Sequence, residues 1–117
     1  MAIRITALVK RRPGMTREEF REHWSNNHAR LFTSLKVMQE NIFHLLSPSS
    51  DALEKAGFNI APYDGAAELW VEKLEDLLAV FGDEDYHKIV VPDEVNFLDR
   101  DSIQIMVGED QVKYEKA

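Results

Sequence analysis

A histidine on an apolar helical stripe is the first side chain in this sequence suited to acid-base chemistry. Between residues 16 and 35, apolar side chains recur at steps of three and four, and His28 falls in that stripe beside Trp24. An imidazole placed there can donate or accept a proton near neutral pH. The alternative is a core histidine that bonds a backbone carbonyl and positions the helix. We predict that His28 is the general acid or base.

Two carboxylates form a second candidate group. Asp64 and Glu68 stand four positions apart in an extended stretch, with Trp70 next along, so all three share one face of a strand. A carboxylate held against an indole has a raised pKa and can act as an acid. We therefore predict Asp64 and Glu68 as further catalytic residues. The alternatives are turn formation before Gly65 for Asp64, and a solvated or ion-paired strand position for Glu68.

Amide, aromatic and imidazole side chains supply the candidates for ligand binding. Gln39 and Asn41 share a strand face with Phe43, so their amides would meet a ligand oxygen if that face lines a pocket. The alternative for both amides is cross-strand pairing at a dimer edge. The predicted substrate-binding residues are Phe20, Trp24, Gln39, Asn41, Phe43, His44, Tyr63 and Trp70.

The sequence contains no motif typical of a metal site or of a large cofactor. His23 and His28 are five positions apart, which separates them by about 140° around a helix. The chain has no cysteine and no glycine-rich nucleotide loop. We expect neither a metal nor a cofactor, and we expect His23 to face solvent beside Glu22.

The elements that must position these side chains follow from the hydrophobic pattern. Pro13-Gly14 breaks a first strand, and Thr16 with Glu19 forms a capping box that begins a helix. Residues 47–56 are expected to form a surface excursion with one possible helical turn at 51–55. The remaining elements are strands at 3–10, 37–46, 66–71 and 102–107, and a second helix at 74–81 that stops at Gly82. The order is that of a ferredoxin-like βαββαβ domain of the α+β class with an antiparallel four-stranded sheet.

Composition limits the classes of partner. A chain of 117 residues with net charge -7 and pI near 5.0 is expected to form one domain over residues 1–117, and to bind neither nucleic acid nor anionic membranes. No secretory pattern precedes the first strand, so a cytoplasmic location is expected. Helices on one face of a four-stranded sheet leave the other face uncovered, and a homodimer would cover it.

Three stretches of the sequence resemble the EthD family. They are residues 10–28 (KRRPGMTREEFREHWSNNH), 63–70 (YDGAAELW) and 93–100 (DEVNFLDR), which occur in the family's order. The resemblance implies a dimeric α+β barrel with a pocket between the sheet and the helices of each subunit. Many fungal members carry a Tyr-x-Gln-x-His run on the second strand. This chain keeps Gln39 but has Val37 and Asn41 at the Tyr and His places.

The resemblance also implies a chemistry. Family members include decarboxylases and dehydratases of aromatic polyketide pathways, relatives that isomerise lactones, and proteins with an auxiliary role. The leading hypothesis is a cofactor-independent lyase or isomerase that acts on a small aromatic or polyketide intermediate of secondary metabolism. In it, His28 moves the proton in a pocket lined by aromatic side chains. The alternatives are a cofactor-free aromatic oxygenase and a non-catalytic accessory protein that binds a small molecule.

Overall fold

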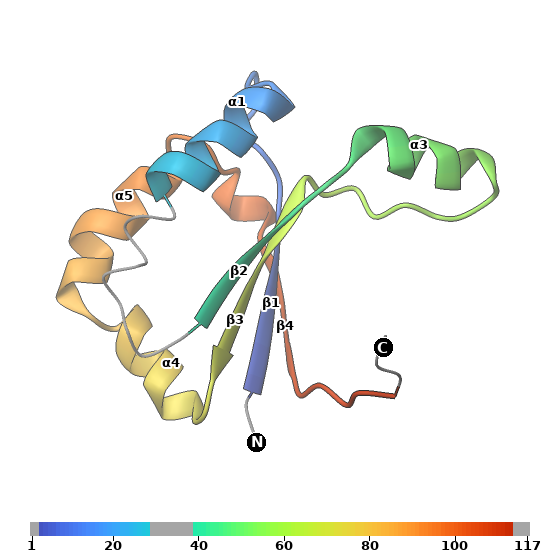
Figure 1. The fold of residues 1–117 in the computed structure, drawn as a ribbon. Coiled ribbons are helices and arrows are strands. Elements are labelled where there is room, and N and C mark those ends of the chain that lie inside the picture. The colour runs from blue at the N-terminus through green and yellow to red at the C-terminus, as the bar shows by residue number, and fades with distance from the viewer. Residues whose placement is uncertain (1–2, 29–38, 114–117) are drawn as a thin grey trace.

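The computed structural model describes residues 3–28 and 39–113, with all their side chains except those of residues 27, 28 and 39–42. Four antiparallel strands form one sheet in the order β2-β3-β1-β4 (Figure 1). The strands are β1 (Ile3–Val9), β2 (Gln39–His44), β3 (Gly65–Val71) and β4 (Gln104–Gly108). The predicted α+β class and the ferredoxin-like strand order are confirmed. The predicted continuation of the first helix to residue 35 lies outside the described residues.

The alternation of side chains along β1 and β3 sets the two faces of the sheet. Ile5 is paired with Leu69 and Ala7 with Ala67, and these positions lie on the face that the helices cover. Thr6 is paired with Glu68, so both lie on the opposite face. We call this second face the open face, because none of the described helices that pack on the sheet covers it.

Helical elements cover the other face. Figure 1 shows α1, α4 and α5 together on one side of the sheet. Thr16 caps α1 with the reciprocal bonds to Glu19 that the sequence predicts, at 3.1 and 3.0 Å. The elements are α1 (Arg17–Glu22), η1 (His23–His28, a π-helix), α4 (Leu74–Phe81), η2 (Tyr86–Val90, also π), α5 (Val91–Glu94) and η3 (Arg100–Ser102, a 3₁₀ turn). No helix within residues 3–28 and 39–113 has both the length and the apolarity needed to cross a membrane.

The excursion between β2 and β3 is more regular than its sequence suggests. Residues Ser47–Lys55 form a nine-residue helix, α3, in place of the single turn expected at 51–55. Pro48 stands in the first turn, where its missing N–H costs no hydrogen bond. Figure 1 shows α3 apart from the sheet and from the other helices, and residues 51–59 are exposed.

The core beneath the helices divides into two buried clusters. One joins Ile5, Leu69 and Val71 of the sheet to Leu77 of α4. The other gathers four residues from β1, α1, η1 and the segment after α5: Val9, Phe20, Trp24 and Phe97. Phe97 is fully buried, and its ring lies 5.7 Å from that of Phe20. The two clusters hold opposite ends of the helical layer, and residues of both line a cavity between them.

Candidate functional site

A cavity of about 700 Å³ lies between the sheet and the helical layer. Its floor contains Ala7 of β1 and Ala67 of β3, which face each other across the strand pair. Two alanines in register leave room that larger side chains would fill. Trp24 of η1 and Phe81 of α4 also line it, one from each of the two packed regions of the core. The sheet therefore offers an apolar floor of the size that a small planar molecule requires.

Apart from the indole of Trp24, the polar side chains that line this cavity in the described part of the chain come from one stretch, residues 86–100. Tyr86 and His87 belong to η2, Glu94 to α5, and Arg100 to η3. The other lining residues are alanine, larger aliphatic or aromatic side chains: Ala7, Val9, Trp24, Ala67, Leu69, Phe81, Val91, Leu98, Ile103 and Ile105. A ligand in the cavity would meet apolar groups on the sheet side and hydrogen-bonding groups on the helical side.

Glu94 is the one buried charged residue among the described residues, with 7 % of its surface exposed. The Nε of Arg100 lies 3.0 Å from Oε2 of Glu94, and the Tyr86 hydroxyl donates to Oε1 at 3.4 Å. Burial raises the pKa of Glu94, and the charge of Arg100 and the Tyr86 bond oppose that rise only in part. The cavity wall thus carries a carboxyl group that holds its proton more readily than an exposed glutamate.

A second polar pair supports this wall. Nε2 of His23 lies 3.0 Å from Oδ1 of Asp93, the neighbour of Glu94, and the His23 ring lies 4.8 Å from that of Phe97. The expectation that His23 faces solvent is wrong, because only 20 % of its side chain is exposed. The pair ties η1 to α5 across the helical layer.

Of the predicted helical residues, Trp24 lines the cavity and Phe20 packs behind it with their rings 5.3 Å apart. His28 ends η1, and its side chain lies outside the description. His44 of β2 meets Trp24 edge-on at 5.4 Å, and its Nε2 lies 3.1 Å from Oγ of Ser25. Burial, and then the charge of Arg21, lowers the pKa of His44. The structure thus places His44 at the outer side of the Trp24 wall.

The predicted strand residues lie on the open face, away from this cavity. Glu68 lies 3.9 Å from Arg4, and the indole Nε1 of Trp70 donates to Asp110 at 3.2 Å. Phe43 is 60 % exposed. By register Asn41 is paired with Glu68, and Gln39 with Trp70. One pocket cannot contact Trp24 and Trp70 together, because the sheet lies between them, so the single aromatic pocket expected from the sequence is divided between two faces.

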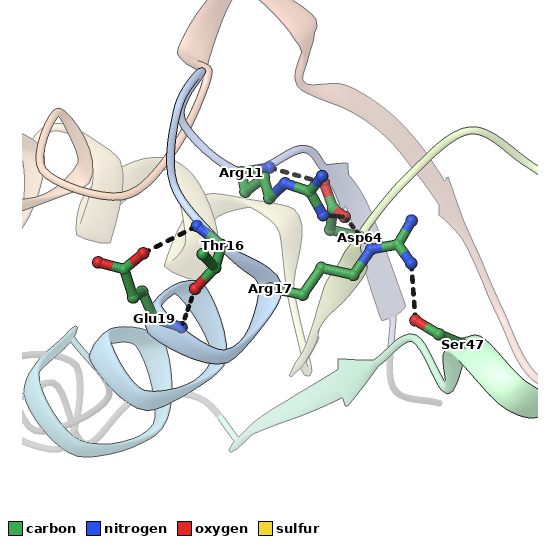
Figure 2. A network of polar contacts seen from close by, with 6 residues as sticks. All are labelled: Arg11, Thr16, Arg17, Glu19, Ser47 and Asp64. Carbon is green, nitrogen blue, oxygen red and sulfur yellow. Dashed lines mark hydrogen bonds and ion pairs between the residues drawn. The ribbon is translucent and has the colours of Figure 1, made fainter.

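Asp64 is engaged in a polar network that fastens three segments (Figure 2). Its carboxylate accepts from the backbone N–H of Arg11 at 2.9 Å, from Nη1 of Arg11 at 3.2 Å and from Nε of Arg17 at 3.3 Å. Arg17 also donates to Ser47 at the start of α3, at 2.7 Å. These contacts are long-range bonds between segments, and Asp64 does not line the cavity. Tyr63 donates to Gln104 on β4, outside the cavity.

The cavity groups that sequence reasoning missed are Glu94 and Arg100, whereas Tyr86 and His87 lie in a charged segment whose sequence favours an exposed position. Glu94 and Arg100 belong to residues 93–100, one of the three stretches that resemble the EthD family. That resemblance is the one feature of the sequence that points to them. Hydrophobic periodicity could not find them, because α5 has four residues and a 3₁₀ turn follows it. Within the described chain, no three His, Asp or Glu side chains are grouped to hold a metal ion.

The protein thus has an α+β fold with a ligand-sized cavity between its sheet and its helices. The EthD domain model matches residues 12–101, and the chain belongs to the EthD domain family. Decarboxylase claH of Passalora fulva is 30% identical over 112 residues, which cover 89% of this chain and 73% of that protein.

Two solved structures share the fold. One is an EthD family protein from Bacillus halodurans, with a TM-score of 0.66, 19% identity, and coverage of 95% of this chain and 100% of that one. The other is a hypothetical protein of Arabidopsis thaliana, with a TM-score of 0.64, 13% identity, and coverage of 97% and 91%. Both are similar in fold over nearly the whole chain.

Proposed function

We propose that this protein is a cofactor-independent lyase that removes carbon dioxide from a small aromatic or polyketide-like acid of secondary metabolism. The observation that carries the proposal is the buried Glu94, held by Tyr86 and Arg100 at the wall of an apolar cavity of about 700 Å³. The similarity to a fungal decarboxylase supports the same reaction class.

Such a reaction needs little from the protein. The bond from the carboxyl carbon to the ring or chain breaks, and its electron pair passes into a neighbouring carbonyl or ring system. A proton then replaces the lost carbon dioxide. The apolar floor holds the planar substrate, and the polar wall stabilises the developing negative charge and supplies the proton. His28 remains a predicted acid or base in this scheme, at the end of the helix that carries Trp24.

The open face supports a second part of the proposal, a homodimer. Met106 of β4 is 71 % exposed and Phe43 of β2 is 60 % exposed, although both stand on strands of the central sheet. By register Met106 is paired with Thr6, which places it on the same face as Glu68. An apolar sheet face of this kind is normally covered by a partner, and a second copy of the chain would cover it symmetrically.

The test uses purified wild-type protein and His28→Ala with a panel of hydroxylated aromatic carboxylic acids. Product mass and oxygen uptake are followed in the same reaction. We expect the mass of carbon dioxide to be lost without oxygen uptake, and we expect the rate to fall in His28→Ala. Oxygen consumption coupled to substrate loss would replace the lyase by an oxygenase. Saturable binding without turnover in either protein would indicate an accessory binding protein.

A further inference from the structure

Arg100 contacts Glu94 and also lines the cavity. The contact is made by Nε, and 49 % of the Arg100 side chain is exposed against 10 % of Glu94. The outer edge of a planar cation, with two parallel N–H groups, is thus available at the cavity.

The rest of the lining makes this edge distinctive. Among the residues that the structure describes, Arg100 is the only lysine or arginine that lines the cavity, and the floor opposite it is apolar. A guanidinium edge binds a carboxylate through two parallel hydrogen bonds, whereas a neutral ligand can use only part of that geometry. The cavity therefore favours a flat apolar body with one carboxylate at its edge.

We propose that Arg100 receives the carboxylate of an aromatic acid through Nη1 and Nη2, and that Glu94 takes up a proton as the acid binds. The inference rests on the proposed function, since it names the substrate class and a second acid for the same site. It assigns Arg100 to substrate recognition and Glu94 to proton donation.

Proton uptake follows from the charges around Glu94. Burial already favours the protonated form, and Arg100 of η3 and Tyr86 of η2 are the groups that oppose it. When Arg100 also binds a substrate carboxylate, two anions share one cation in a poorly solvated site, and one of them is best neutralised. The other titratable groups nearby in the described part of the chain are His87 of η2 and Asp93 of α5, and Asp93 is bonded to His23 of η1.

The stored proton fits the balance of the reaction. As the carboxyl carbon leaves as carbon dioxide, its bonding electron pair stays on the substrate carbon, and the Glu94 carboxyl group transfers its proton there. The product carries hydrogen where the carboxylate was. Glu94 returns to the anionic form beside Arg100, which no longer holds a second anion. One proton is consumed in each cycle, and it enters when the next acid binds.

Calorimetric titration with two unreactive probes tests the proposal without turnover. The probes are 2-naphthoate and its neutral analogue 2-naphthamide, each titrated in two buffers of different ionisation enthalpy at the same near-neutral pH. We expect 2-naphthoate to bind more tightly and to take up protons, and 2-naphthamide to bind without proton uptake. Equal affinities, no binding of either probe, or 2-naphthoate binding without proton uptake would overturn it.

Three variants separate the two roles. Arg100→Gln should weaken 2-naphthoate binding by about 10- to 100-fold, as expected for the loss of charge-assisted hydrogen bonds, with little effect on 2-naphthamide. Glu94→Gln should keep 2-naphthoate binding and lose the proton uptake. The control is Arg12→Gln, an exposed arginine that does not line the cavity.

Each variant is checked by near-ultraviolet circular dichroism for a native fold before titration. Uptake that persists in Glu94→Gln would move the proton to another group such as His87 and contradict the assignment. Unchanged 2-naphthoate binding by Arg100→Gln would contradict the role of Arg100 in binding the carboxylate. Neither probe is turned over, so these titrations do not depend on catalysis. A substrate panel without decarboxylation would contradict the proposed function, whereas titrations without the expected binding would contradict the roles of Arg100 and Glu94.

Discussion

Glu94 is held at the cavity wall by two side chains that lie several positions away from it in the sequence. In the sequence it is one of 21 acidic residues, in a stretch with no clear period. In the structure it is buried, with Tyr86 eight positions before it and Arg100 six positions after it as partners. Those partners meet it because η2, α5 and η3 fold around one wall of the cavity. No spacing rule for a regular helix or strand joins these three residues.

His44 offers a prediction at the same scale. Its pKa is lowered from 6.5 by burial and by Arg21, so the folded protein favours the neutral ring more than the unfolded chain does. The stability that this contributes is present above pH 6.5 and is lost as the pH falls through the lower pKa of the folded state. His44→Gln should therefore flatten the acid side of the curve of melting temperature against pH.

The matched control for this prediction is His87→Gln, on an exposed position of η2. It should leave the slope between neutral and acid pH close to that of the wild-type protein. If wild type and His44→Gln lost stability in parallel as the pH falls, the burial of His44 would have no part in the acid sensitivity of the fold.

At the scale of elements, the strands and the capped helix were predictable, because each has a local pattern that one face of the fold enforces. Both the alternating side chains of β1 and β3 and the Thr16-Glu19 capping box depend only on residues that are close together in the sequence. The helix α3 was underestimated, since Ser-Pro-Ser-Ser is typical of a turn while Pro48 is equally suited to the first turn of a helix. The π-helical elements η1 and η2 carry no pattern that the amphipathic period would show.

The start of β3 is held by a close approach that only glycine permits. A Cβ on Gly65 would overlap the carbonyl oxygen of Phe43 and lie 2.9 Å from Cζ3 of Trp24. Gly65→Ala should lower the free energy of unfolding by about 1–3 kcal/mol, because β2 or the indole must shift. Urea denaturation followed by tryptophan fluorescence measures the loss.

Gly108→Ala is the comparison variant, since a Cβ at the end of β4 meets no atom within 4 Å. It should change stability much less than Gly65→Ala. Equal effects of the two substitutions would show that the contact of β2 and Trp24 with Gly65 is looser than described.

At the scale of the whole molecule, the sequence predicts which residues share one face of a strand more readily than it predicts which face of the sheet the helices cover. The sequence grouped Gln39, Asn41 and Phe43 on one face, and Glu68 and Trp70 on one face. The register pairs Asn41 with Glu68 and Gln39 with Trp70. What the sequence could not give is that the helices pack on the other face, with Trp24. That choice depends on the handedness and packing of the complete fold.

The open face gives the prediction for assembly. We expect the wild-type protein to be a dimer by light scattering after size-exclusion chromatography. Met106→Glu should shift it toward a monomer, because a carboxylate would be buried without a partner at the interface. Leu78→Glu is the control, since Leu78 is 60 % exposed on α4, on the helical side of the sheet. A monomeric wild type, or a Met106→Glu protein that stays dimeric, would contradict a dimer through this face.

The central claim is that the reaction takes place in the cavity behind the sheet, and filling that cavity tests it most directly. Ala67→Phe places a ring on the cavity floor, between β3 and the helical layer. The measurement is the rate of carbon dioxide release from the best substrate of the panel, with Leu78→Phe on the outer side of α4 as the control. The account predicts a fall of about 100-fold or more for Ala67→Phe, because the substrate can no longer reach its reactive position. It predicts a rate near that of wild type for the control. Full activity in a folded Ala67→Phe protein, together with its loss in Glu68→Gln, would place the reaction on the open face and contradict the account.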